Sequence, residues 1–198
     1  GNSDELVSAR IANSDDDLML VTRKGMSLRF EASDEALRPT GRTTSGVRGI
    51  KLRSGDELLT MEVVVDDADF VVVTEGGYAK RTPLSEYRVQ GRGGLGIKVA
   101  NVREDRGALV GALVTSGDEE LLAISEGGKI VRVNVSEDRP TGRTTAGVIL
   151  ARPDEDDRLI AVTRNTESQV DDEAPQVESD QAVEDQGDTV SGEENADD

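Results

Sequence analysis

The chain has 198 residues, enough for one or two domains, and it lacks Cys, His and Trp. These absences exclude disulfides, Cys/His zinc sites, histidine acid–base chemistry and Ser-His-Asp triads within the chain. The net charge of −18 is distributed unevenly: Thr166–Asp198 carries 13 acids and no base, which leaves 28 acids and 23 bases in residues 1–165. The body of the chain can therefore still bind a polyanion.

The two ends of the chain differ from its body. The opening Gly1-Asn2-Ser3 lacks an initiator Met, so we expect a piece of a longer protein. No signal peptide and no membrane-length apolar run is present, which predicts a soluble, cytoplasmic protein. Asp4–Val7 resembles Asp56–Leu59, so residues 1–12 are predicted to hold the last strand of a preceding, truncated unit. Residues 166–198 contain no aromatic residue and few large aliphatic ones, which predicts a disordered acidic tail.

The body of the chain repeats itself. One repeated motif is an apolar run that ends in Gly, and it occurs at Leu18–Gly25, Phe70–Gly77 and Leu121–Gly128. The final glycines are spaced by 52 and 51 residues. An arginine follows each of these glycines at a matched position, and the three are Arg29, Arg81 and Arg132.

A second motif confirms the repeat and indicates its architecture. Arg38–Val47 returns as Arg139–Val148 at an offset of 101, with nine of ten positions identical. Short β-branched runs alternate with Gly, Asp and Ser turn signals, and no segment has a sustained helical period. A period near 50 with about four strands per unit is typical of propeller blades. The sequence predicts an all-β fold with three four-stranded blades, at about residues 13–65, 66–115 and 116–165.

Positive and negative charges alternate in phase with this repeat. Residues 36–55 hold five bases and no acid, whereas residues 56–76 hold seven acids and no base, and the alternation continues to residue 152. Because matched parts of blades lie on the same side of a ring, this predicts a basic rim and an acidic face. A basic rim suits an anionic polymer, and with only two Phe and two Tyr we expect duplex backbone contact rather than base stacking. The alternative is an ordinary solvated surface of mixed charge.

The glycine-rich segment Gln90–Gly96 allows three interpretations. It contains G-x-G-x-x-G, but this dinucleotide fingerprint works only between a strand and a helix, and a strand pattern follows here. It could also be a purely structural turn. The third interpretation is a cationic loop that lets phosphate approach the main-chain amides.

At these residues the chain resembles a known family. Gln90–Gly96 resembles the GyrA box, Q-R-R-G-G-K-G, of the A subunits of bacterial DNA gyrases, and Pro83–Tyr87 is similar to the segment that precedes this box. Gly41–Val47 and Gly142–Val148 resemble the degenerate versions of the box in other blades. The resemblance covers about residues 4–165. It implies about three blades of the six-bladed β-pinwheel that ends the gyrase A chain.

The sequence departs from the box at two positions. Gly91 stands where the box has its first Arg, and Leu95 stands where it has Lys. The segment is therefore most similar to the secondary box of actinobacterial gyrases, in the next-to-last blade. The principal box would then precede Gly1.

The resemblance also implies a function. It implies a domain that wraps double-stranded DNA, within an enzyme of two A and two B subunits that introduces negative supercoils. It implies no catalytic or metal-binding residue and no cofactor in this chain, since ATP and Mg²⁺ would be used by elements elsewhere, and no membrane contact. The alternatives are the matching domain of topoisomerase IV and a protein-interaction propeller. The predicted DNA contacts are Arg29, Arg38, Arg42, Arg48, Lys51, Lys80, Arg81, Gln90, Arg92, Gly93, Gly94, Arg132, Arg139 and Arg143.

Overall fold

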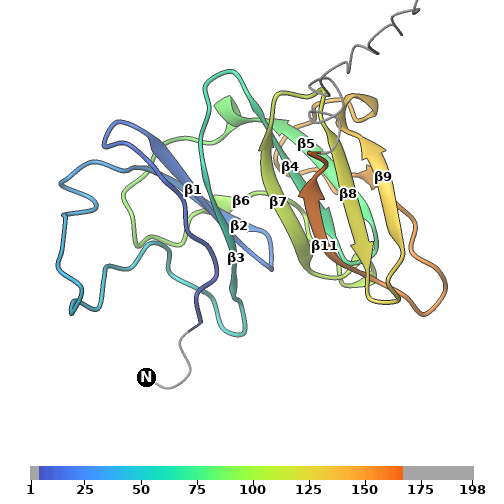
Figure 1. The fold of residues 1–198 in the computed structure, drawn as a ribbon, viewed down its shortest axis with the longest axis horizontal. Helices are drawn as coiled ribbons and strands as arrows, with labels where there is room; N and C mark the ends of the chain where they lie inside the picture. The colour runs from blue at the N-terminus through green and yellow to red at the C-terminus, as the bar shows by residue number, and fades with distance from the viewer. Residues whose placement is uncertain (1–4, 167–198) are drawn as a thin grey trace, which may run out of the picture. The chain divides into compact units, whose positions relative to one another are not determined.

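The structure is a computed structural model that describes residues 5–166. The predicted disordered tail therefore lies outside the described residues, apart from Thr166. Over residues 5–166 the chain forms eleven β-strands and three short 3-10 helices, with no α-helix (Figure 1). The predicted all-β fold is confirmed.

The first sheet is antiparallel and has the order β3-β1-β2-β6. Its three long strands are β1 (Asp17–Thr22), β2 (Met26–Glu31) and β3 (Leu58–Val63). The fourth strand, β6 (Ile97–Lys98), pairs with the start of β2. Gly25 forms the β1–β2 turn with φ of +82°, a conformation that suits glycine because it has no Cβ.

The second and third sheets follow the same plan. The second has the order β10-β5-β4-β7, and the third has the order β11-β8-β9. The strands of the second sheet are β4 (Asp69–Thr74), β5 (Tyr78–Pro83), β7 (Leu109–Thr115) and β10 (Val148–Ile149). The strands of the third sheet are β8 (Glu120–Ser125), β9 (Ile130–Asn134) and β11 (Leu159–Arg164).

The fourth strand of each of the first two sheets comes from the next unit of the chain. β6 belongs to the second predicted unit but pairs with β2 of the first. β10 belongs to the third unit but pairs with β5 of the second. The third sheet has only three strands, since no later described segment pairs with β9. Periodicity gives the number of strands in a unit but not the neighbour with which a short strand pairs.

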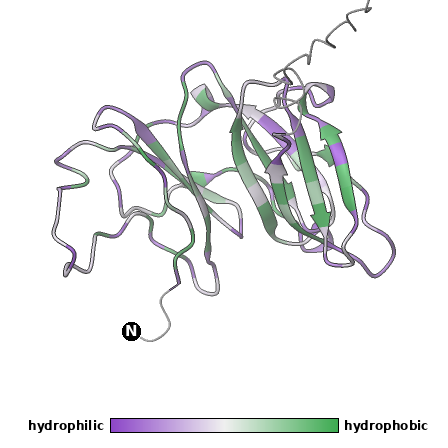
Figure 2. Cartoon of the chain, in the orientation of Figure 1, coloured by the Kyte–Doolittle hydropathy of each residue, from purple (hydrophilic) through white to green (hydrophobic). Residues whose placement is uncertain are grey.

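Two apolar layers hold the sheets together. The strands β7 and β8, which contribute to them, are largely hydrophobic in Figure 2. Met19 and Val21 of β1 pack with Phe70 and Val72 of β4 in the first layer. The alternate residues of β4, Val71 and Val73, pack with the third sheet in the second layer. The strand β4 is thus apolar on both faces because it lies between two cores, as its sequence predicts. β7 contacts both β3 and β11, so the sheets meet along these strands.

Three 3-10 helices follow or link the strands. They are η1 (Leu84–Glu86), η2 (Glu104–Arg106) and η3 (Val135–Glu137). Leu84 and Val135 occupy matched positions after β5 and β9, and both are buried. This burial fixes the direction in which the chain leaves the strand.

The strand predicted within residues 1–12 is not formed by residues 5–12. Leu6 and Ile11 are 85% and 99% exposed. A strand is stabilised by pairing with a neighbour, and none of the described strands pairs with this segment. Its assignment to a preceding blade stays a prediction.

Candidate nucleic-acid interface

Three equivalent loops contain the Gly-Arg pair of the repeat. We call residues 40–46, 90–96 and 141–147 loop 1, loop 2 and loop 3; their arginines are Arg42, Arg92 and Arg143. Each loop ends in a glycine with the same left-handed backbone: φ is +71° at Gly46, +70° at Gly96 and +78° at Gly147. The repeat in sequence is therefore also a repeat of local structure.

Loop 2 packs on the first sheet. The amide of Gln90 donates to the carbonyl oxygen of Arg29 at 2.8 Å. The amide of Gly93 donates to Gly49 at 2.5 Å, and the carbonyl of Gly94 accepts from the amide of Lys51 at 2.7 Å. The glycines of the G-x-G-x-x-G segment thus hold loop 2 against residues 49–51.

The side chain of Arg92 also connects loop 2 to the first unit of the chain. Its Nε donates to the carbonyl of Ala36 at 2.6 Å, and one Nη donates to the carbonyl of Arg48 at 3.4 Å. The residue is nevertheless exposed. A guanidinium group has five N–H donors, so donors remain for a phosphate.

Loop 3 lies on the second sheet in the same way. The amide of Thr141 donates to the carbonyl of Arg81 at 2.7 Å, as Gln90 does to Arg29. A Cβ on Gly147 would overlap the carbonyl oxygen of Ala79, so only glycine fits. Arg143 is half-buried and donates to the carbonyl of Lys98 at 3.0 Å.

Loop 1 lies on no sheet within residues 5–166. A Cβ added to Gly41 or Gly46 would meet no atom within 4 Å. The basic residues in and around this loop are exposed; they are Arg38, Arg42, Arg48 and Lys51. Loop 1 therefore shows the charge of the motif without the packing that loops 2 and 3 receive.

Arg29 and Arg81 lie at matched positions of β2 and β5, where each forms an internal ion pair. Arg29 forms an ion pair with Asp17 at 2.6 Å, with side chains 15% and 17% exposed, and it also donates to the carbonyls of Leu84 and Tyr87. Arg81 pairs with Asp69 in the same way. These arginines connect a strand to the segment that follows the sheet. Both arginines are held in largely buried ion pairs, and their contact with DNA stays a prediction.

Arg132 is the matched arginine of the third unit. It differs from Arg29 and Arg81 because, within the described residues, nothing from a following unit covers β9. Its side chain is 60% exposed and lies 3.8 Å from Glu120. Arg139, at the start of the segment that leads into loop 3, is also exposed. Both positions are accessible to a large partner.

Lys80 is also buried rather than exposed, with 2% of its surface accessible. Its Nζ donates to the carbonyl of Gly142 at 3.2 Å and to the carbonyl of Arg143. Burial and the nearby guanidinium of Arg143 lower the pKa of Lys80 from 10.5 to about 8, against the opposing effect of Glu86. The structure therefore places this predicted contact beneath loop 3.

Sequence reasoning missed Arg106. Its guanidinium lies over the ring of Tyr78 at 3.9 Å and donates to the carbonyls of Ala146 and Gly147 at 2.7 and 3.3 Å. The matched residue of the first unit is Ser54, so the repeat gave no signal for an arginine here.

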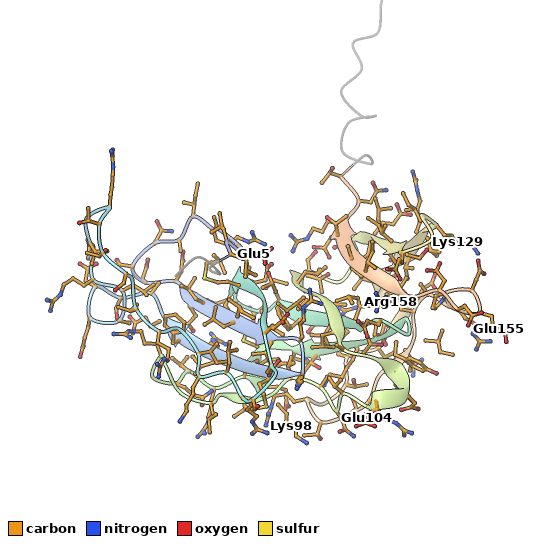
Figure 3. The ribbon with its side chains drawn as sticks, turned by 90° about the horizontal axis from the view of Figure 1, so that it is seen from below. Glu5, Lys98, Glu104, Lys129, Glu155 and Arg158 are labelled. Atoms are coloured by element: carbon orange, nitrogen blue, oxygen red, sulfur yellow. The ribbon has the colours of Figure 1, made fainter. Side chains whose placement is uncertain are left out.

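Loops 2 and 3 lie at the same edge of the first and second sheets. Loops 2 and 3 pack against β2 and β5, whereas the sheets meet along β3, β7 and β11. The acidic stretches 56–76 and 99–126 contain β3 and β7, and they also contain β4 and β8. In Figure 3, Lys98 lies near Glu104 and well apart from Lys129, Glu155 and Arg158.

Other kinds of binding site have little support within residues 5–166. Loop 2 leads into the short strand β6 and not into a helix, so it lacks the context of a dinucleotide site. No cluster of His, Cys, Asp or Glu in residues 5–166 has a geometry that could hold a metal ion. No helix in this part of the chain is long and apolar enough to cross a membrane.

Known proteins have sequences similar to that of this chain. The family model of the DNA gyrase C-terminal domain, a β-propeller, matches residues 16–64, 68–116 and 119–165. The A subunit of DNA gyrase from Streptomyces coelicolor is 50% identical over 183 residues, which cover 92% of this chain and 21% of that protein. Its counterpart from Mycolicibacterium smegmatis is 49% identical over 164 residues, which cover 83% and 20%. The chain thus spans about a fifth of these relatives.

Solved structures share the fold. A structure of a DNA gyrase A C-terminal domain matches with a TM-score of 0.76 and 28% identity, over 83% of this chain and 55% of that one. The C-terminal domain of a DNA topoisomerase IV matches with a TM-score of 0.71 and 24% identity, over 76% and 47%. The resemblance seen at loop 2, including its actinobacterial type, is confirmed by these relatives. The chain belongs to the family of DNA gyrase C-terminal β-propeller domains.

Proposed function

We propose that this chain is the DNA-binding and DNA-wrapping part of the A subunit of a DNA gyrase. The observation that carries the proposal is the repetition of one Gly-Arg loop at the same edge of successive sheets. Evenly repeated cations and exposed loop backbone suit the phosphates of a duplex, which carries one charge per about 1.7 Å of its axis. Contacts to phosphate fix the path of the DNA without reading its sequence.

In the parent protein this domain serves an enzyme that uses ATP and Mg²⁺ to supercoil DNA in the cytoplasm. We assign catalysis, ATP and Mg²⁺ to other parts of that enzyme, including the B subunits, and only duplex binding to this chain. The domain contributes by bending the DNA around its rim, and the cost of bending is offset by the additional phosphate contacts.

The fold is common to gyrase and topoisomerase IV, so it does not separate the two. The sequence favours gyrase, since the family model of the gyrase C-terminal domain matches residues 16–64, 68–116 and 119–165 and the A subunit of the Streptomyces coelicolor gyrase is 50% identical. A protein-interaction propeller would be favoured only by a basic edge that fails to bind duplex.

The test is a charge-matched pair of triple variants. The first replaces the loop arginines with Ala: Arg42, Arg92 and Arg143. The control replaces three exposed cations outside the loops, each paired with an acid: Arg103, Lys129 and Arg158. Both variants lose three positive charges, so a difference between them reports on position rather than on net charge.

We expect the loop variant to bind duplex more weakly and with a salt slope reduced by about 2.7, if each arginine contacts one phosphate. The control should bind like the unaltered chain, since exposed ion pairs contribute little to the fold. Fluorescence anisotropy with a labelled duplex measures both quantities. Equal binding by the two variants would refute the assignment of the loops.

A further inference from the structure

Two cations lie beneath loop 3. Lys80 comes from β5 and Arg106 from η2, and both direct their donors to the backbone of this loop. The carbonyls that accept from them are those of Gly142, Arg143, Ala146 and Gly147. Tyr78 supports Arg106 from the other side through its ring face. Loop 3 is thus attached at its start and at its end.

The first sheet holds loop 2 without such cations. Leu28 stands at the position of Lys80, and Ser54 stands at the position of Arg106. The side chain of Leu28 packs under Gly94 instead. The two cations are therefore a particular feature of loop 3 and not a requirement for packing such a loop on a sheet.

The amide N–H groups of Gly142, Arg143 and Thr144 have no acceptor among the described residues. Gly142 and Thr144 are exposed. Residues 142–145 form a turn closed by the amide of Thr145 and the carbonyl of Gly142. Successive amides in a turn form a concave, partly positive surface that binds anions.

We propose that Lys80 and Arg106 are positioning residues that fix loop 3 as a phosphate-binding nest, with the amides of residues 142–144 facing the DNA. This inference rests on the proposed function and deepens it. The phosphate contacts the amides and the guanidinium of Arg143, and Lys80 and Arg106 act through the loop.

The charge of Lys80 can be varied with pH. The charged and titratable groups around it are Arg143 of loop 3, Glu86 of η1, and Tyr87 and Asp138 after η1 and η3. Burial raises the pKa of both Tyr87 and Asp138. The pKa of Lys80 itself is lowered to about 8 by burial and by Arg143. A phosphate on loop 3 favours the charged form of Lys80, so affinity should fall as pH rises from 7 to 9.

The residues introduced at positions 80 and 106 are those found at the matched positions of the first sheet. Lys80→Leu and Arg106→Ser are therefore both compatible with the fold. Lys80→Arg keeps the cation but removes its titration below pH 12. Lys129→Ala is a control that removes one exposed charge from the acidic turn far from Lys98 (Figure 3).

One readout needs no DNA. Trypsin cleaves after Arg143 in loop 3 and after Arg42 in loop 1, and loop 1 packs on no sheet and so serves as an internal standard. We expect cleavage after Arg143 to become faster in Lys80→Leu and in Arg106→Ser, while cleavage after Arg42 stays the same. Unchanged cleavage after Arg143 would overturn the positioning role, whether or not the chain binds DNA.

The second readout is duplex affinity against pH. We expect Lys80→Leu to bind about tenfold more weakly at pH 7, the scale of one charge-assisted hydrogen bond, and without a pH dependence between 7 and 9. Lys80→Arg should bind well and also lack the pH dependence, and Lys129→Ala should retain it. If Arg92→Ala weakens binding while Lys80→Leu retains the affinity and pH profile of the unaltered chain, the proposed function survives and this inference fails. If the unaltered chain binds no duplex, the proposed function fails, and the nest fails with it.

Discussion

The carbonyl oxygen of Ser27 in β2 occupies the space beside Gly96 in which any other residue would place its Cβ. Ala79 in β5 does the same to Gly147. Gly46 has the same positive φ but no neighbour within 4 Å. The same glycine is therefore required by backbone conformation in all three loops and by packing in only two.

Alanine at these glycines should separate the two effects. Gly46→Ala should cost only the strain of a positive φ, about 1–2 kcal/mol at most and confined to loop 1. Gly96→Ala and Gly147→Ala must also displace a strand carbonyl, so we expect a larger loss, about 3 kcal/mol or more in the free energy of unfolding. Urea unfolding measures the three variants, and equal losses would show that loops 2 and 3 do not pack on the strands.

The ion pair between Asp17 and Arg29 should matter more for stability than for binding. Arg29→Ala leaves a largely buried carboxylate without its partner, so we expect a loss of about 3 kcal/mol. Arg132→Ala removes the matched but 60% exposed side chain, and we expect a change below about 1 kcal/mol. Thermal unfolding of both variants tests this. A stable Arg29→Ala protein with weak DNA binding would instead place Arg29 at the DNA surface.

The ionised carboxylate of Glu119 should stabilise the third sheet, and this contribution should be lost in acid. Partial burial opposes ionisation of Glu119, but hydrogen bonds from the hydroxyl of Thr115 and the amides of Ser116 and Gly117 outweigh it and lower its pKa to about 2. A lowered pKa contributes stability that is complete above the unfolded value near 4.5 and is lost as pH falls from 4.5 towards 2. Glu119→Gln should therefore lower the Tm at pH 7 and have little effect near pH 2. A constant difference in Tm would contradict this.

Much of this fold could be predicted from the sequence because the repeat carries it. The glycines at 25, 77 and 128 mark equivalent hairpin turns, and the apolar run of β4 indicates a strand between two cores. The match between Arg38–Val47 and Arg139–Val148 is enough to identify loops 1 and 3 as equivalent. Loop 2 is recognised through its glycines.

The remaining features depend on contacts between units, which a repeat does not encode. Arg29 and Lys98 are both bases in a strand pattern, but the first is covered by the following segment and the second is exposed. The pairing of β6 and β10 with a strand of the preceding unit could not be predicted from the sequence either, because each of these strands is only two residues long. Arg106 has a serine as its counterpart, so only the structure shows that it contacts loop 3.

The most direct test of a phosphate track along loops 1–3 is duplex affinity measured against salt concentration. If the chain contacts about five phosphates, log affinity should fall with log salt at a slope near −4.5, or roughly 500-fold between 50 and 200 mM salt. Affinity should be nearly the same for unrelated duplex sequences, because phosphates carry no sequence information. A flat salt response, or a strong preference for one sequence, would contradict the account.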